Sequence, residues 1–170
     1  GHCIPIDPHY LSWKLKTLNY TTRFIELAEE INGGMPALVT RLITKALNED
    51  AKPLRGSKVL ILGVAYKPDI TDCRESPAIP IIEGLLDGGG LIEYQDDFVP
   101  ELKLGHGENA VVMESVSLDY SALVDYDCVV IVTHHKYFEA SQILETAPRI
   151  VDTRNLTGRQ GTLSNKVLKL

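Results

Sequence analysis

A cysteine and an aspartate near the start of the chain have the types and spacing of a covalent catalytic pair. Cys3 lies in a Gly/Pro-rich stretch, four residues ahead of Asp7, where we expect a helix to begin. The positive end of a helix dipole favours a thiolate, which is a nucleophile for covalent catalysis. A nearby carboxylate can serve as a general base. The alternative is a buried, inert cysteine, and these residues alone leave both interpretations open.

Three cations follow predicted strands or the loops after them. Lys67 lies just after the first strand, Arg74 precedes the next helix, and Arg154 follows the last strand. Residues 87–127 carry ten carboxylates and a single basic residue, Lys103. An anionic ligand would therefore be repelled by that region and attracted to the three cations. The alternative for each cation is a solvated surface charge.

Other polar residues at strand ends have weaker indications. Asp96 and Asp97 end the second strand, where an acidic side chain could contact a ribose hydroxyl. His134 and His135 follow a buried strand and could suggest a metal site. Adjacent side chains diverge and no third ligand is evident, so we predict a structural or surface role and no metal.

The second part of the chain alternates strand and helix. Strands are predicted at residues 58–64, 91–95, 128–132 and 149–152, and helices at residues 77–87, 118–123 and 137–146. This order predicts a doubly wound, parallel α/β sheet that binds ligands at the carboxyl ends of its strands. Gly63 stands alone where the dinucleotide fingerprint needs three glycines, so the sheet is Rossmann-like without the usual pyrophosphate turn. The tail from Leu156 is expected to be ragged, although Val167 and Leu168 could dock.

The first part of the chain is predicted to be helical. Asp7 is the expected cap of a helix that begins at Pro8, a second helix spans residues 22–31, and a third spans residues 35–48. The Asn-Gly-Gly at residues 32–34 is expected to separate the last two. Pro and Gly near residues 52–56 mark the boundary between a helical segment, 1–52, and an α/β domain, 53–170.

Composition sets the broad class. The chain has 170 residues, of which 44% are hydrophobic and 24% charged, as in a soluble globular protein. Its net charge of −6 argues against a nucleic-acid surface, and no apolar run is long enough to span a membrane. Three cysteines without a CxxC pair argue against a disulfide scaffold and favour the reducing cytoplasm. Because the first residue is Gly rather than Met, we expect a piece of a larger protein.

Two longer motifs resemble a known family. Residues 1–10, Gly-His-Cys-Ile-Pro-Ile-Asp-Pro-His-Tyr, resemble the catalytic-cysteine motif of the UDP-glucose/GDP-mannose dehydrogenases. Residues 63–78, Gly-Val-Ala-Tyr-Lys-Pro-Asp-Ile-Thr-Asp-Cys-Arg-Glu-Ser-Pro-Ala, resemble the second signature of that family. Residues 132–138 and 151–155 are weaker matches in the expected order. The resemblance therefore covers nearly the whole chain.

The resemblance implies an oxidation of the C6 alcohol of a nucleotide sugar to a carboxylate, with two NAD⁺. It implies that Cys3 attacks the aldehyde intermediate and forms a thioester, and that Asp7 activates or orients the hydrolytic water. Lys67 and Arg154 would hold the substrate. Tyr10 is near enough to Cys3 in the sequence to touch the substrate as well. Arg74 would reach the pyrophosphate of NAD.

The resemblance also implies partners and limits. The helices of residues 8–48 resemble the element through which the family forms homodimers. Ile6, where the UDP-glucose branch commonly has Lys, shifts the expected substrate to a UDP-N-acetylhexosamine. The family's amino-terminal NAD domain is missing, so we expect this piece alone to be inactive.

Two other functions compete with this interpretation. One is a non-catalytic module that binds a nucleotide sugar or dimerises. The other is a stand-alone cysteine hydrolase, which needs a histidine base near Cys3. Only His2 and His9 are close in sequence, and neither has an evident orienting partner.

Overall fold

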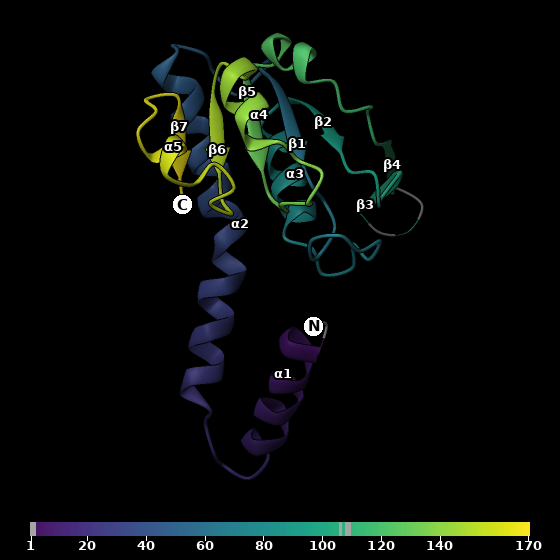
Figure 1. The fold of residues 1–170 in the computed structure, drawn as a ribbon. Helices are drawn as coiled ribbons and strands as arrows, with labels where there is room; N and C mark the ends of the chain where they lie inside the picture. The colour runs from purple at the N-terminus through teal and green to yellow at the C-terminus, as the bar shows by residue number, and fades with distance from the viewer. Residues whose placement is uncertain (1–2, 106, 108–109) are drawn as a thin grey trace. The chain divides into compact units, whose positions relative to one another are not determined.

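The computed structural model describes residues 3–105, 107 and 110–170, and the side chains of residues 3–5 lie outside the description. The chain forms two compact units, Gly1–Pro36 and Ala37–Leu170. This division falls earlier in the chain than the boundary predicted near residues 52–56. Figure 1 shows why: one long helix contributes its first part to the first unit and its last part to the second.

Two helices form the first unit, and the second of them continues into the other unit. They are α1 (Cys3–Lys16) and α2 (Arg23–Glu49). The Thr22 hydroxyl donates a hydrogen bond of 2.6 Å to Ser12 Oγ, and Lys16 Nζ lies 2.8 Å from Glu26 Oε1. These polar contacts join α1 to the start of α2.

Two predictions about these helices are wrong. The first helix begins at Cys3, so Asp7 does not cap it and Pro8 lies inside it. Pro8 removes only one N–H group, close to the amino end of the helix. The second helix runs without a break through Gly33 and Gly34. Each helical glycine costs about 1 kcal/mol relative to alanine, which a long cooperative helix tolerates.

The second unit is built on a parallel sheet, as predicted. Its strands are β1 (Lys58–Leu62), β2 (Leu91–Gln95), β5 (Cys128–Ile131), β6 (Ile150–Asp152) and β7 (Val167–Lys169). They lie in the order β2-β1-β5-β6-β7, and every neighbouring pair is parallel. This confirms the α/β fold class, with a helical segment followed by a doubly wound sheet (Figure 1).

Helices cover both faces of the sheet. They are α3 (Ala78–Asp87), the 3-10 helix η2 (Tyr120–Asp125), α4 (Ala140–Thr146) and α5 (Gly158–Thr162). Ile61 and Val130 belong to the core shared with α3 and the last part of α2. Their neighbours along the strands, Leu60 and Val129, belong to the core shared with α4 and η2. The strands are therefore buried on both faces, which explains their continuous apolar runs.

The start of α3 agrees with its sequence signal. Ser76 Oγ accepts a hydrogen bond of 3.3 Å from the N–H of Ala78, the first helical residue.

Within the described residues, no helix is both long and apolar enough to cross a membrane.

Two segments differ from the prediction. The polar stretch after β2 contains an antiparallel hairpin of β3 (Glu101–Leu104) and β4 (Val111–Glu114). The tail is not ragged, because it forms α5 and the edge strand β7. Arg149 explains part of this order: its Nη1 donates to Asn165 O at 3.1 Å and to Glu49 Oε2 at 2.9 Å. One buried guanidinium thus ties the segment before β7 to the end of α2.

Candidate functional site

The strand order puts a topological switch point at the carboxyl ends of β1 and β5. These two strands are neighbours, and the chain leaves them toward opposite edges of the sheet, through β2 and β6 respectively. Such a switch point is where open α/β sheets bind ligands. The loops that begin at Gly63 and Thr133 therefore form the first place to examine.

The two loops touch where they leave the sheet. Gly63 has φ +78°, and a Cβ on it would lie 2.0 Å from Thr133 O. The Thr133 hydroxyl donates a hydrogen bond of 2.7 Å to Ala65 O. Only glycine fits this close backbone approach, so the single glycine noted in the sequence fixes the spacing of the two loops.

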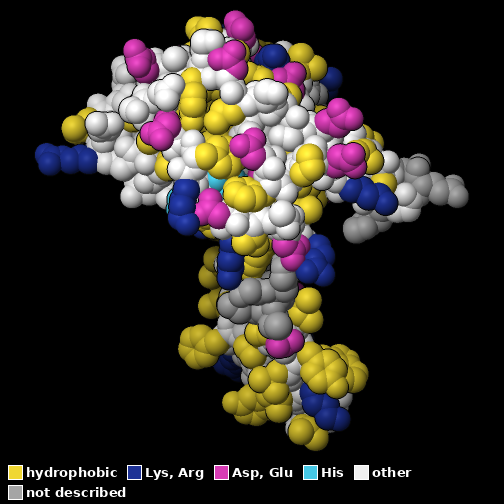
Figure 2. All heavy atoms as spheres, turned by 45° about the vertical axis from the view of Figure 1, so that its right-hand side comes forward, with side chains coloured by type: hydrophobic (Ala, Val, Ile, Leu, Met, Phe, Trp, Pro, Cys, Tyr) yellow, Lys and Arg dark blue, Asp and Glu magenta, His cyan; other side chains and the backbone are white. Residues whose placement is uncertain are grey.

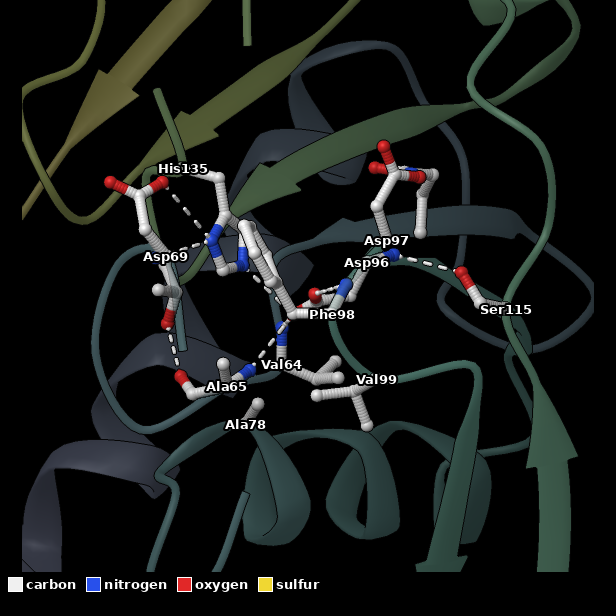
Figure 3. Close-up of polar contacts among 12 residues, drawn as sticks. Val64, Ala65, Asp69, Ala78, Asp96, Asp97, Phe98, Val99, Ser115 and His135 are labelled. Atoms are coloured by element: carbon white, nitrogen blue, oxygen red, sulfur yellow. Dashed lines mark hydrogen bonds and ion pairs between the residues drawn. The ribbon is translucent and has the colours of Figure 1, made fainter. Parts of the chain in front are cut away.

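Asp96, at the end of β2, is the centre of the polar network in Figure 3. Its side chain is fully buried. Its Oδ2 accepts hydrogen bonds from the N–H groups of Val64 at 2.8 Å and Ala65 at 2.9 Å, and its Oδ1 accepts one from Phe98 N at 2.9 Å. His135 Nε2 lies 2.9 Å from Asp96 Oδ2. These partners enclose the carboxylate, so Asp96 is not available for the ribose contact that was one of the weaker indications in the sequence.

His135 is also fully paired. Its Nδ1 accepts a hydrogen bond of 2.9 Å from Asp69 N, which assigns the ring proton to Nε2, facing Asp96. The Tyr137 ring stacks on the imidazole, with 5.3 Å between centroids and an interplanar angle of 6°. The ring is buried and both of its nitrogens have partners, which suits the structural option of the prediction made for His134 and His135. The described residues contain no group of three or more His, Cys, Asp or Glu placed to hold a metal.

The pKa of Asp96 results from opposing effects. Burial alone would raise it, but the hydrogen bonds from His135, Val64 and Ala65 outweigh burial and lower the pKa below its ordinary value. The pKa of Asp69 is lowered as well, mainly by the backbone and side-chain hydrogen bonds of Lys136. Both carboxylates are therefore charged at neutral pH.

A second buried carboxylate organises the exit of β6. Asp152 accepts hydrogen bonds from the N–H groups of Arg154, Leu156 and Thr157, at 3.0, 3.1 and 2.8 Å. Burial would raise its pKa, but the hydrogen bonds from Thr157 and the other amides lower it. The turn holds Asn155 at φ +59°. This carboxylate fixes the backbone that carries Arg154.

A hollow of about 310 Å³ lies at the carboxyl ends of β5, β6 and β7. It is lined by His134, Asp152, Thr153, Arg154, Asn155, Lys169 and Leu170. Lys169 Nζ lies 2.6 Å from Asn155 Oδ1. Within the described part of the chain, no side chain pairs with the Arg154 guanidinium, and His134 Nδ1 is a buried atom without a hydrogen-bond partner. The hollow therefore offers the unpaired Arg154 guanidinium to a ligand, whereas His134 Nδ1 is buried.

The three predicted cations differ in their surroundings. Arg154 lines the hollow, whereas Lys67 and Arg74 do not. Lys67 is exposed, with its ammonium 5.8 Å from the centre of the Tyr66 ring. The Arg74 guanidinium forms two hydrogen bonds with Asp72, at 3.0 and 2.7 Å. The charges of Arg154 and Lys67 are thus free to bind an anion, as the prediction requires. The Arg74 guanidinium is instead paired with the Asp72 carboxylate.

The predicted catalytic residues belong to the first unit. Positions 3, 7 and 10 are all in α1, where a four-residue step from 3 to 7 is about one helical turn. The side chain of Cys3 lies outside the described residues. Asp7 is exposed, and the exposed Tyr10 ring lies 5.8 Å from that of Trp13.

The hydrolase alternative loses support from α1. His9 does have an acidic partner, since its Nδ1 lies 3.0 Å from Glu29 Oε2, contrary to the expectation of none. Six residues separate it from position 3, which is about 240° around a helix and thus on another face. Position 7 lies nearly in line with position 3.

Most of the residues that shape these strand exits have no clear signal in the sequence. Thr133, Asp152 and Asn155 fall within the two weaker family matches without a predicted role, and Lys169 has no signal in the sequence. Asp96 and His135 were noted separately, but their pairing across 39 positions has no local signal. An acidic residue at the end of a buried strand or directly after it is a usable sign for Asp152 and Asp96.

Comparison with protein families decides the class. Residues 60–159 match the UDP-glucose/GDP-mannose dehydrogenase family, UDP binding domain. This match spans more than half of the chain. The chain belongs to the UDP-glucose/GDP-mannose dehydrogenase family. The resemblance seen in the sequence motifs is therefore confirmed, and the matched residues run from β1 to α5.

Curated members of the dehydrogenase family extend the match along the chain. A UDP-N-acetyl-D-mannosamine dehydrogenase of Methanocaldococcus jannaschii is 32% identical over 168 residues, which cover 94% of this chain and 35% of that protein. One of Campylobacter jejuni is 33% identical over 142 residues, covering 81% of this chain and 32% of that protein. The chain thus spans about a third of the length of these relatives.

Solved structures of dehydrogenases share the fold. A UDP-D-ManNAc dehydrogenase from Pyrococcus horikoshii has 26% identity and a TM-score of 0.73, over 91% of this chain and 34% of that one. An NDP-N-acetyl-D-galactosaminuronic acid dehydrogenase from Methanosarcina mazei has 23% identity and a TM-score of 0.79, over 100% of this chain and 37% of that one. The second likeness concerns the fold alone.

Proposed function

We propose that this chain is the carboxy-terminal part of an NAD-dependent nucleotide-sugar 6-dehydrogenase. The reaction is the oxidation of the C6 alcohol of a UDP-N-acetylhexosamine to a uronic acid. The observation that carries the proposal is the match of residues 60–159 to a UDP-binding domain. Relatives named UDP-N-acetyl-D-mannosamine dehydrogenase support an N-acetylated sugar.

The nucleotide sugar is proposed to bind at the carboxyl edge of the sheet. Arg154 lines the hollow there with an unpaired guanidinium, which suits bidentate contact with a phosphate. Lys67 adds an exposed ammonium on the loop after β1. The acidic segment between residues 87 and 127 disfavours an anion on its side, so the two cations set the direction of approach.

The covalent chemistry is proposed for α1. The Cys3 thiolate adds to the carbonyl carbon of the C6 aldehyde, and loss of a hydride from that carbon leaves a thioester. Water then attacks the thioester carbonyl while Asp7 accepts a proton, which releases the carboxylate and restores the thiol. One helical turn between positions 3 and 7 supports this division of roles. We propose that Tyr10, one turn beyond Asp7, touches the sugar.

NAD is the proposed hydride acceptor for both oxidations, but this sheet does not fit it in the usual way. The amides of Val64 and Ala65, at the exit of the first strand, already donate to Asp96. Arg74 is the one residue proposed to reach NAD, by exchanging its Asp72 partner for a phosphate. The rest of the cofactor site is therefore assigned to another part of the complete enzyme.

A homodimer through the helices of residues 8–48 is proposed as well. The helical unit exposes large apolar side chains, and Phe24 is 88% exposed. The others on α1, α2 and the loop between them are Ile6, Tyr10, Leu11, Trp13, Leu18, Tyr20, Leu27, Ile31 and Leu38. Figure 2 shows hydrophobic side chains gathered on this helical segment. An apolar surface of this density favours burial against a second copy.

Binding is tested by calorimetric titration of UDP into the 170-residue chain. We expect saturable binding that Arg154→Ala weakens at least tenfold, since a charged hydrogen bond contributes about 1.5–3 kcal/mol. Arg159→Ala is the matched control, because Arg159 is exposed on α5 and does not line the hollow. Equal effects of the two substitutions, or no heat with the parent chain, would contradict the proposed site.

Catalysis is tested in a complete dehydrogenase that contains this chain. Cys3→Ser should abolish formation of the uronic acid from the UDP-sugar, because the thioester cannot form, while leaving UDP affinity unchanged. Cys73→Ser is the control, because Cys73 is a half-buried free cysteine in a loop of the other unit. Full turnover by the Cys3 variant would refute the nucleophile.

A further inference from the structure

The anion that meets the first strand exit is part of the protein. In dinucleotide-binding sheets, the backbone N–H groups after the first strand receive a pyrophosphate. Here Val64 and Ala65 donate those groups to Asp96 Oδ2, at 2.8 and 2.9 Å. The carboxylate comes from the neighbouring strand β2 and has no exposed surface. A side chain therefore takes the place that a phosphate takes elsewhere.

This carboxylate is completely satisfied. Its four donors are the N–H groups of Val64, Ala65 and Phe98 and the Nε2 of His135 (Figure 3). A buried charge is stable only with such compensation. All four of these donors point at the Asp96 carboxylate, which leaves none of them for a ligand. The contact is therefore a fixed part of the loop structure and not a ligand site.

The same pair fixes the loop on both sides of Lys67. Before it, Ala65 is held by Asp96 through its N–H and by Thr133 through its carbonyl. After it, the Asp69 N–H donates to His135 Nδ1 at 2.9 Å. Asp69 has φ +61°, a left-handed conformation that aspartate adopts more readily than most non-glycine residues. The ammonium of Lys67 itself remains exposed.

We propose that Asp96 and His135 are positioning residues of the nucleotide-sugar site: they hold residues 64–69 in the shape that presents Lys67 to the anionic part of the substrate. Neither touches the ligand. This inference rests on the proposed function, because Lys67 is a substrate residue only under that proposal. It assigns a role to two residues that are otherwise explained only as buried polar groups.

The loop is tested first without any nucleotide, by amide hydrogen exchange on the 170-residue chain. In Asp96→Asn, we expect exchange at Val64, Ala65 and Asp69 to become at least tenfold faster, with β5 unchanged. Asp127→Asn is the matched control, because Asp127 also accepts a backbone N–H, that of Lys58 at 2.8 Å, at the opposite end of the sheet. Unchanged protection of the loop in the Asp96 variant would overturn the inference.

A double-mutant cycle then tests the link to the ligand. Asp96→Asn should weaken UDP binding about tenfold in the parent chain and less than twofold in Lys67→Ala, because both changes remove the same contact. Independent, multiplying losses would overturn the positioning role and indicate general damage. A parent chain that binds no UDP would overturn the proposed function instead, and the exchange result would still decide whether the pair fixes the loop.

A second pair of variants guards against misfolding of the first. His135→Gln keeps an N–H that can donate to Asp96, whereas His135→Leu removes it. We expect the Gln variant to retain UDP affinity within threefold and slow exchange at Ala65, and the Leu variant to lose both. Equal behaviour of the two variants would contradict the proposal.

Discussion

Individual carboxylates do similar work at two strand exits of this sheet. Asp96 accepts hydrogen bonds from two backbone N–H groups of the loop after β1. Asp152 accepts hydrogen bonds from three backbone N–H groups of the turn after β6. Each lies in a position where the chain changes direction and backbone N–H groups would otherwise lack partners. The two loops that carry Lys67 and Arg154 are thus shaped by acids that themselves stay out of solvent.

Replacement of Asp152 should destabilise the second unit. An amide cannot accept three N–H groups as a carboxylate does, so Asp152→Asn is expected to lower the free energy of unfolding by about 2 kcal/mol at neutral pH. Urea denaturation measures this. Asp125→Asn, at an exposed position, is the control and should change it by less than about 0.5 kcal/mol.

The difference in the free energy of unfolding between the parent and Asp152→Asn should depend on pH in a defined direction. Because the pKa of Asp152 is lowered in the folded state, its stabilising effect is present above the unfolded pKa of about 3.9 and is lost as the pH falls through the folded value. The gap between the parent and Asp152→Asn should therefore narrow below about pH 4. A gap that is constant from pH 7 to pH 3 would contradict the assignment.

At the scale of elements, the distance between β1 and β5 at their exits depends on one glycine. Gly63→Ala would place a Cβ 2.0 Å from Thr133 O, and we expect a loss of about 3 kcal/mol or more in urea denaturation. Gly56→Ala shares the positive φ, at +82°, but has nothing within 4 Å. It should cost only about 1 kcal/mol, and equal losses would show that backbone conformation alone matters.

The continuous second helix yields a prediction of the opposite sign. Gly33 and Gly34 are exposed in the interior of α2, and a Cβ on either would meet nothing within 4 Å. Gly34→Ala should therefore raise helicity in circular dichroism and stabilise the helix by about 1 kcal/mol. A loss of helicity would indicate that the glycine is needed for a close contact.

The strands could be predicted because their sequences are unambiguous. The continuous apolar runs at β1 and β5 match strands buried on both faces, and the structure has them within two residues of the prediction. The hairpin of β3 and β4 was missed because β3 alternates over only four residues and the Val-Val-Met-Glu sequence of β4 does not alternate. β7 was missed as a strand because three residues carry too little pattern, and its partner β6 supplies the order.

The site was predicted in part. Cations at strand exits follow from the parallel sheet, so Lys67 and Arg154 could be placed before any coordinates. The pairing of Asp96 with His135 could not, because it depends on the register of β2 and β5 on either side of β1. Sequence placed each residue at a strand end but could not show that their side chains converge.

At the scale of the whole molecule, the helical unit predicts self-association. Phe24→Glu should shift the chain from dimer to monomer in sedimentation velocity, because a charge at an 88% exposed aromatic position would have to be buried in an interface. Leu163→Glu is the control, since Leu163 is 78% exposed but lies beside α5 in the other unit. A parent chain that sediments as a monomer would contradict the proposed dimer.

The margins of the sheet have a consequence for colloidal behaviour. The outer margin of β2 is occupied where Val116 N donates to Tyr94 O at 2.9 Å. The opposite margin, β7, is three residues long, is preceded by Lys166 and ends in Lys169. A long bare margin would let separate molecules join strand to strand and grow into fibrils. Both margins here offer little room for such growth, so concentrated solutions of the protein should resist filament formation.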